Sequence, residues 1–259
     1  GSVIVIAEMN DASSQAFLRG HDDEVTSIAL SHNGKLLASG QKGNNSDLII
    51  WDFNSRSILF KLSEHDFRIE ILQFSQDDKL LFSSGNVEDK KIFIWDTNTG
   101  YIVTNCQTFP LKTVAMAWGY KIRDNRGNPT ENYQLATCGG FTLALWTLDP
   151  FKGTIDYEQV QTGNFSREYI SLAYSLNEQK FLYAGTTSGD VVCFLVKNKM
   201  IVFSKIICAK GITSIIPLSK TQVIVGGGDG TLSLNYIEEP KCETLANVQL
   251  FGAIYSLSP

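Results

Sequence analysis

Two short segments of this chain end in the same pair of residues, a tryptophan followed at once by an aspartate. The segment "LIIWDFNSR" occupies residues 48–56, and "IFIWDTNTG" occupies residues 92–100. In both, the residues before the pair alternate as in a β-strand, and those after it have the composition of a tight turn. Because the two tryptophans are 44 residues apart, the chain is expected to be built from repeats.

Strand-like segments recur around both pairs, every 8–12 residues. No segment keeps a helical period over 11 residues, so an all-β chain with four strands per repeat is predicted. A period of this length with four strands per unit is typical of a β-propeller. The eight segments of the first two units are "VTSIAL" (25–30), "KLLASG" (35–40), "DLIIWD" (47–52), "SILFKL" (57–62), "IEILQF" (69–74), "KLLFSSG" (79–85), "KIFIWD" (91–96) and "YIVTNC" (101–106).

Later units carry Trp146, Phe194 and Asn235 at the tryptophan position, so successive markers are separated by 41 to 51 residues. The longest interval contains a polar insertion at 120–132, interpreted as a surface loop between two strands. We therefore predict one propeller over residues 1–259, of the seven-bladed type, with its first and last blades incomplete in this sequence. Its parts are a blade tail at 1–18, blades at about 19–62, 63–107, 108–161, 162–206 and 207–250, and the start of a further blade at 251–259.

A tryptophan between stacked sheets fills space well, but its one N–H donor needs a partner. In the second unit a buried relay is predicted to supply it, from Asp89 through His65 and Ser83 to Trp95. The first unit has His21, Ser39 and Trp51, with either Asn45 or Asp47 completing the relay, whereas the third keeps Thr137 and Trp146 but has Pro110 and Gly140 where histidine and aspartate would stand. These residues are interpreted as structural anchors.

The composition excludes several functional classes. The net charge of −5 argues against a broad nucleic-acid surface. Five scattered cysteines without a CxxC pair, and three histidines, indicate reduced thiols and neither a metal site nor a cofactor. No apolar run is long enough to span a bilayer, and no nucleophile has a catalytic context. The segment "VGGGDGTL" (225–232) is interpreted as a hairpin and not as a phosphate-binding loop. The prediction is a non-catalytic intracellular protein without a small-molecule substrate.

Charged residues at the turns that join one blade to the next are candidate partner contacts, chosen by strand order. They are Arg19, Asp23, Arg68 and Arg167. The insertion adds Lys121, Arg123 and Arg126, which belong either to an ordinary surface loop or to a partner contact that other blades lack.

The stretches "GHDDEVTSIALSHNGKLLASG" (20–40) with "LIIWD", and "EHDFRIEILQFSQDDKLLFSSG" (64–85) with "IFIWD", resemble the WD-repeat β-propeller family. Further stretches are similar to one subfamily, the cilia- and flagella-associated WD-repeat proteins, and to the first of its two propellers. They are "FLRGHDDEV" (17–25), "LLASGQ" (36–41), "DLIIWD" (47–52), "QTGNFSRE" (161–168) and "LYAGTTSGDVV" (182–192).

The resemblance implies a structural protein of the ciliary or flagellar axoneme, in contact with tubulin and neighbouring axonemal proteins. The alternative is a general cytosolic WD-repeat adaptor in a multiprotein complex. A propeller enzyme is the third possibility, and it would require a pocket lined by convergent carboxylates.

Overall fold

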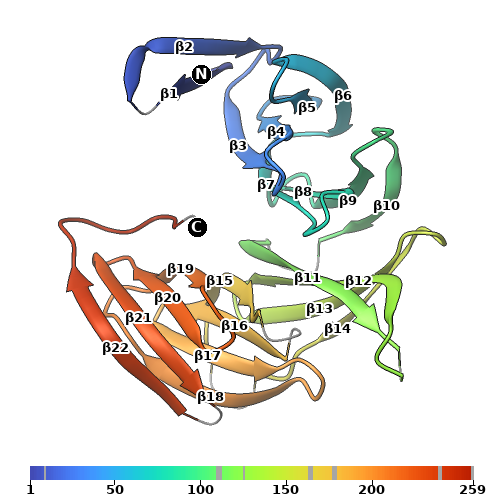
Figure 1. Ribbon diagram of the computed structural model, residues 1–259. Helices are drawn as coiled ribbons and strands as arrows, with labels where there is room; N and C mark the ends of the chain where they lie inside the picture. The colour runs from blue at the N-terminus through green and yellow to red at the C-terminus, as the bar shows by residue number, and fades with distance from the viewer. Residues whose placement is uncertain are drawn as a thin grey trace. The chain divides into compact units, whose positions relative to one another are not determined.

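The computed structural model describes residues 1–8, 10–108, 113–124, 126–162, 166–176, 180–238 and 241–257 (Figure 1). These residues form 22 β-strands and no α-helix. The chain divides into two compact units, residues 1–112 and 113–259, and each is described by itself. The expectation of one domain with the blade boundaries given above remains a prediction.

The first unit contains a two-stranded and two four-stranded antiparallel sheets, whose strands pair in chain order. The strands are β1 (Val3–Glu8), β2 (Asp11–Arg19), β3 (Val25–Leu30), β4 (Leu36–Gln41), β5 (Ser46–Asp52), β6 (Ser57–His65), β7 (Ile69–Phe74), β8 (Leu80–Gly85), β9 (Lys91–Asp96) and β10 (Ile102–Gln107). The predicted pair of strands at the start of the chain is β1 and β2, and β3–β6 and β7–β10 are the first two predicted units.

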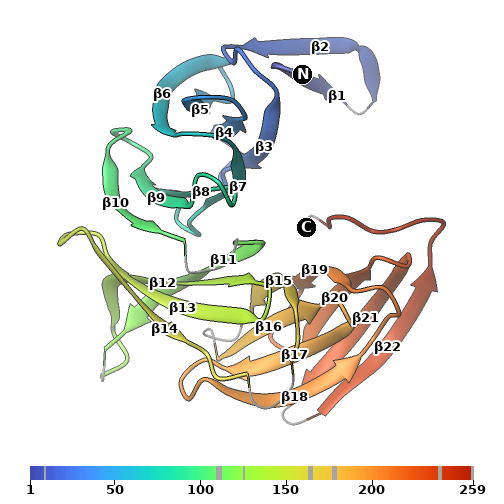
Figure 2. The ribbon, with the colours of Figure 1, turned by 180° about the vertical axis from the view of Figure 1, so that it is seen from behind.

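The second unit contains three four-stranded antiparallel sheets, again in chain order, which Figure 2 shows from behind. The strands are β11 (Ala115–Arg123), β12 (Pro129–Gly139), β13 (Thr142–Asp149), β14 (Thr154–Gln159), β15 (Tyr169–Tyr174), β16 (Phe181–Thr186), β17 (Asp190–Leu195), β18 (Met200–Ile206), β19 (Ile212–Pro217), β20 (Gln222–Gly227), β21 (Thr231–Glu238) and β22 (Lys241–Gln249). The segment 225–232 forms the β20–β21 hairpin, as expected from its Asp-Gly turn.

The two middle strands of these sheets are the most buried, because both of their faces are covered. Five of the six residues of β4 and all six of β8 are buried, whereas most of β22 is exposed. Residues on both faces of the middle strands are therefore buried, including polar ones such as Ser39 and Ser83.

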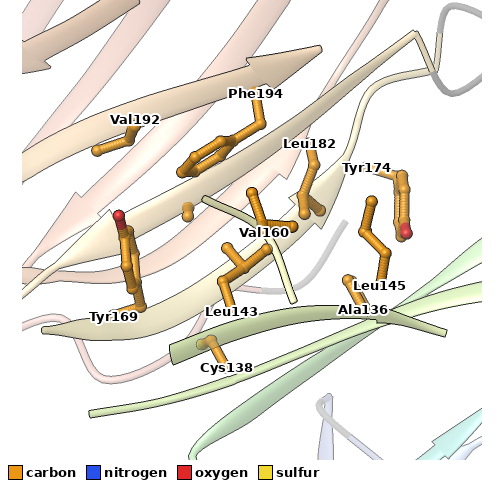
Figure 3. Close-up of a cluster of buried hydrophobic side chains, with 12 residues drawn as sticks. Ala136, Cys138, Leu143, Leu145, Val160, Tyr169, Tyr174, Leu182, Val192 and Phe194 are labelled. Atoms are coloured by element: carbon orange, nitrogen blue, oxygen red, sulfur yellow. The ribbon is translucent and has the colours of Figure 1, made fainter. Parts of the chain in front are cut away.

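The hydrophobic core lies between neighbouring sheets of the same unit. In the first unit, one cluster joins Leu48 and Ile50 of β5 to Ile69 of β7 and Trp95 of β9. In the second unit, the cluster shown in Figure 3 draws on β11–β13 and on β15–β17, with Phe194 and Tyr169 among its largest members. Each sheet is thus stabilised by burying its faces against the next sheet, as a repeat architecture requires.

The insertion at 120–132 differs from the surface loop predicted for it. Both flanking strands continue into it, so β11 has nine residues and β12 has eleven, and Lys121 pairs with Tyr133. The first two strands of the other four-stranded sheets have six residues each. Polar composition suggested a loop, but alternating side chains with β-branched and aromatic members also suit a solvent-exposed hairpin.

Neighbouring sheets approach most closely where a glycine of the second strand faces an isoleucine that opens the next sheet. A Cβ at Gly40 would lie 2.6 Å from Cγ2 of Ile69, and one at Gly185 would lie 2.6 Å from Cβ of Ile212. A hydroxyl group reinforces both contacts, because Thr26 donates to the Ile69 carbonyl over 2.6 Å and Ser171 donates to the Ile212 carbonyl over 2.7 Å.

Residues 251–257 repeat this contact without forming the first strand that was predicted for them. A Cβ at Gly226 would lie 2.8 Å from Cγ2 of Ile254, and Thr213 donates to the Ile254 carbonyl over 2.5 Å. Ile254 therefore occupies the place that Ile69 and Ile212 occupy in their sheets. Residues 258 and 259 lie outside the described residues.

We expect Gly40→Ala to lower the free energy of unfolding by roughly 1–3 kcal/mol, because the added methyl group overlaps Ile69. Ile69→Leu removes the γ2 methyl group and should relieve part of this cost in the double variant. Urea unfolding of the two single variants and of the double variant measures the coupling. Strictly additive effects would show that the two residues are not in contact.

Candidate functional site

The relay predicted for the second repeat, whose strands are β7–β10, is a continuous chain of hydrogen bonds. The Trp95 Nε1–H donates to Ser83 Oγ over 2.9 Å, and Ser83 Oγ lies 2.8 Å from Nε2 of His65. The His65 Nδ1–H donates to Oδ2 of Asp89 over 2.6 Å. Because an ionised carboxylate only accepts hydrogen bonds, Nδ1 of His65 carries the proton of its bond to Asp89.

The aspartate ends this relay with a second contact. Asp89 Oδ1 accepts the backbone N–H of Asp66 over 2.6 Å. Burial raises the pKa of Asp89, but the hydrogen bonds from His65 and Asp66 outweigh burial and hold that pKa below its ordinary value. A Cβ at Gly85 would overlap the Asp89 carboxylate, so the second strand needs glycine here to admit the aspartate.

Ser83, His65 and Asp89 have the connectivity of a hydrolase triad, yet their surroundings oppose catalysis. The side chains of His65 and Asp89 are fully buried, and so is Ser83. The Ser83 oxygen is already occupied by the Trp95 N–H, whereas a nucleophile must be open to a substrate and to an oxyanion site. The arrangement ties β8, β9 and the turn between them to the end of β6, which belongs to the preceding sheet, and it satisfies their buried polar atoms.

The first repeat has the same contacts from tryptophan to serine and from serine to histidine, but a different group lies at Nδ1 of the histidine. Ser39 Oγ accepts from Trp51 Nε1 over 2.8 Å and lies 2.6 Å from Nε2 of His21. The group at Nδ1 of His21 is Oε1 of Gln41, at 2.7 Å, and Gln41 Nε2 donates to Asp22 over 2.5 Å.

The prediction that Asn45 or Asp47 completes this relay was therefore wrong. Asp47 instead accepts from Ser63 and pairs with Lys61, at 2.5 and 2.8 Å. Gln41 lies two residues after Ser39 on the same strand, so both side chains point to one face. This alternation is the sequence signal that identifies Gln41.

The third and fourth sheets simplify the relay step by step. Trp146 Nε1 donates to Thr137 Oγ1 over 2.8 Å, so the indole keeps an acceptor. Pro110, suggested at the histidine position, lies outside the described residues. In the fourth sheet Phe194 replaces tryptophan and Ala184 occupies the serine position, so the donor and its acceptor are absent together.

Arg167, a candidate partner contact, forms an ion pair with a buried aspartate of the fourth sheet. Its Nε lies 2.8 Å from Oδ2 of Asp190, and its side chain is 18% exposed. Asp190 also accepts from Ser204 over 2.9 Å and from Thr186. The sequence signal missed here is an aspartate at the position of Asp47, four residues before the tryptophan position.

The fifth sheet keeps only the aspartate end. Asp229 Oδ2 accepts from the backbone N–H of Ala209 over 2.7 Å, as Asp89 accepts from Asp66. The residue before Ala209 is Cys208, so a cysteine stands where the histidine stands in the second sheet. At the tryptophan position, Asn235 donates to Ser233 Oγ over 2.9 Å.

The remaining turn residues lie in the first unit, and two of them are grouped. Lys42 pairs with Glu24 over 2.6 Å, and the backbone of Lys42 forms a bridge with exposed Arg68. Asp23 is next to Glu24 and accepts its backbone N–H over 2.6 Å. Arg19 is exposed and its guanidinium lies 5.7 Å from the ring centre of Phe17. Asp23 and Arg68 thus share one charged edge, which we call the Lys42 edge (Asp23, Glu24, Lys42, Arg68).

The basic residues of the insertion lie on the β11–β12 hairpin. Lys121 pairs with Glu131, and Arg123 donates to the Gly127 carbonyl over 2.7 Å. Arg126 is exposed in the turn.

In the described part of the chain, no group of three or more His, Cys, Asp or Glu side chains could hold a metal ion, and no helix is long and apolar enough to cross a membrane. All five cysteines carry free thiols. Burial raises the pKa of the Cys138 thiol to about 12 and that of Cys106 to about 11, so neither is an activated nucleophile.

We expect His65→Ala to cost roughly 1–3 kcal/mol of stability, because it removes one buried hydrogen-bond partner from Asp89 and one from Ser83. Trp95→Ala should cost roughly 3–5 kcal/mol as a large core truncation. A double-mutant cycle of His65→Ala and Ser83→Ala, read by urea unfolding, isolates their coupling. An unchanged unfolding midpoint in His65→Ala would show that the hydrogen bonds contribute nothing to stability.

A pH dependence follows from His21. Its pKa is lowered mainly by burial, so the folded state favours the neutral ring. The unfolded chain then binds more protons, and stability should fall as the pH drops below about 6.5 towards the folded-state pKa. His21→Gln should reduce the loss of unfolding free energy between about pH 7.5 and pH 5.5. Equal losses in wild type and variant would contradict this expectation.

Comparison with known proteins identifies the repeat. The family described as "WD domain, G-beta repeat" matches residues 12–52 and 56–96. The fold matches the Cps50 (Swd1) β-propeller domain of Myceliophteria thermophila with a TM-score of 0.70, at 17% identity over 89% of this chain and 74% of that one. It also matches a chain of the mitotic checkpoint complex (TM-score 0.75, 17% identity, 98% and 74% covered) and U3-55K (0.73, 18%, 98% and 78%).

Full-length relatives are more specific. The chain is 31% identical over 268 residues to cilia- and flagella-associated protein 52 of Chlamydomonas reinhardtii, and 30% identical over 281 residues to that of Bos taurus. All of this chain is covered in both comparisons, and it spans 41% of the length of each relative. These matches confirm the predicted fold and the resemblance noted from the sequence. Two segments of the chain match the WD-repeat family, its fold matches that of solved β-propellers, and over its whole length it is similar to part of cilia- and flagella-associated protein 52.

Proposed function

We propose that this chain is a non-catalytic protein-interaction scaffold of the ciliary or flagellar axoneme. The observation that carries the proposal is the similarity of all its residues to cilia- and flagella-associated protein 52, at 31% identity in Chlamydomonas reinhardtii. The chain spans 41% of that relative's length, so the proposal rests on the part of the relative that it matches.

The mechanism of such a scaffold is static. Sheets that are joined by buried polar relays and by close glycine–isoleucine contacts hold their connecting turns at fixed positions. A surface that is already ordered loses little conformational entropy on binding, so more of the contact energy appears as affinity. The first two sheets, which have the complete and the modified relay, provide the most strongly fixed turns.

The Lys42 edge is the proposed contact surface of the first unit. It combines exposed Arg68 with Asp23 and with the Lys42–Glu24 ion pair. Exposed pairs of this kind contribute little to stability, so their charges are available to a partner. Mixed charges favour a protein partner over nucleic acid, and the resemblance suggests tubulin or a neighbouring axonemal protein. Arg19 lies in the same unit and is proposed as a further contact.

Fractionation of flagellated cells tests the proposal. After membranes are removed with detergent, the protein should remain with axonemes that are washed with salt on the order of 0.5 M, where exposed charge pairs are screened. The matched variant Arg68→Glu should be released at lower salt than Lys35→Glu, which changes another exposed residue of the same unit.

Recovery of the wild-type protein wholly in the soluble fraction would contradict the axonemal role and favour a cytosolic adaptor. An organism that has no flagellated stage at any point in its life cycle would also contradict it.

A further inference from the structure

We propose that the tip of the β11–β12 hairpin is a docking element for an acidic polypeptide segment. The proposal rests on the interaction role proposed above and names the chemistry of one partner. The docking element consists of Arg123, Asp124, Arg126, Gly127 and Asn128, and is called the basic tip below; Figure 1 shows the hairpin that carries it.

The tip belongs to an extension that the sheet does not need for its core. Beyond Trp118, which pairs with Leu135, the hairpin continues for several residues on each strand. Residues 123, 124 and 126–129 are exposed, so they bury no apolar surface in the sheet. The four other four-stranded sheets are stable with six-residue strands at this position. These exposed residues at the tip therefore add surface without adding core.

The tip is also held in one conformation. Asp124 Oδ1 accepts the backbone N–H groups of Arg126 and Asn128 over 2.8 and 2.9 Å. The Asp124 N–H donates to the Asn128 carbonyl over 2.8 Å, and Gly127 has a φ of 84°, which favours glycine. A turn that is ordered in this way loses little entropy when it binds a partner.

The charges of the hairpin are distributed unequally between its base and its tip. At the base, Lys121 is paired with Glu131, so their charges offset each other. At the tip, the Asp124 carboxylate is engaged by backbone N–H groups of its own turn. One Arg123 nitrogen donates to Gly127, which places that guanidinium beside the turn that carries Arg126.

Among the residues that the structure describes, none forms an ion pair with Arg123 or Arg126. Two guanidinium groups thus face solvent at one rigid point of a chain whose net charge is −5. Guanidinium groups bind carboxylates through paired hydrogen bonds, so a segment rich in glutamate or aspartate fits this tip. A nucleic acid fits less well, because it requires a wider basic surface.

Fluorescence anisotropy with a labelled octaglutamate peptide tests the proposal on the whole chain. Wild type should bind the peptide in about 50 mM salt and bind it more weakly in about 300 mM salt, as screening predicts. Arg123→Glu/Arg126→Glu should weaken binding by at least about tenfold. The control Lys197→Glu/Lys220→Glu makes the same change in net charge at two exposed lysines of the same unit and should stay within about twofold of wild type.

A second variant separates binding from folding. Replacing residues 122–130 by Asn-Gly joins Lys121 to Glu131 through a short hairpin turn. It should unfold within a few degrees of wild type, because the removed residues are not part of the core, and it should lose the peptide.

Absence of wild-type binding, equal binding by the arginine variant, or an equal loss in the lysine control would overturn the proposal. Equal binding of an octameric oligothymidylate would overturn the assignment to a polypeptide. If axonemal retention persists in any of these cases, the basic tip is rejected and the scaffold role stands. If the tip binds the peptide but the protein is not axonemal, the axonemal role is rejected and the basic tip stands as a docking element.

Discussion

Each buried hydrogen-bond donor in these stacked sheets must find an acceptor, because an unpaired polar group that is shielded from water costs free energy. The indole N–H illustrates the constraint most clearly. Each tryptophan of a third strand pairs with a residue of the second strand. The residue two positions after that partner carries a hydroxyl group, and it is Ser39, Ser83 or Thr137. Where the third strand carries Phe194, that position is Ala184. Donor and acceptor are therefore kept or lost together, as the cost of an unpaired buried group requires.

A second constraint concerns the position on the second strand that lies two residues after the hydroxyl. A glycine at this position leaves space for an aspartate of the following turn. Gly85 leaves room for the Asp89 carboxylate, and a Cβ at Gly227 would lie 2.8 Å from Oδ1 of Asp229. In the first sheet that position is Gln41, whose own amide oxygen fills the place of the carboxylate. The histidine meets a neutral group there, and the negative charge moves outward to Asp22. Burial lowers the pKa of His21, and the hydrogen bond to the neutral Gln41 amide offsets that effect only in part.

These constraints explain what the sequence could predict. The strand period, the tryptophans and the histidines of the first two sheets follow local patterns, and the structure has the corresponding strands and hydrogen bonds. Gln41 was missed because the group at Nδ1 of His21 was sought in the turn after the second strand. In the second sheet the corresponding group, Asp89, does lie in that turn. Arg167 was taken for a surface residue because no sequence pattern connects it with Asp190, which lies 23 positions later. The hairpin was taken for a loop because its composition is polar, whereas strand pairing beyond the core depends on backbone hydrogen bonds and tolerates polar side chains.

The family repeat and the sheet are also offset from each other, and this offset helps to make the scaffold rigid. The matched repeat 12–52 spans β2 to β5, and the repeat 56–96 spans β6 to β9. The sheet β3–β6 thus takes three strands from one repeat and its outer strand from the next. One repeat cannot complete a sheet without its successor, so neighbouring sheets are joined covalently as well as by packing. In the sheet β15–β18, which lacks the tryptophan and its hydroxyl acceptor, the Arg167–Asp190 ion pair supplies a different polar contact.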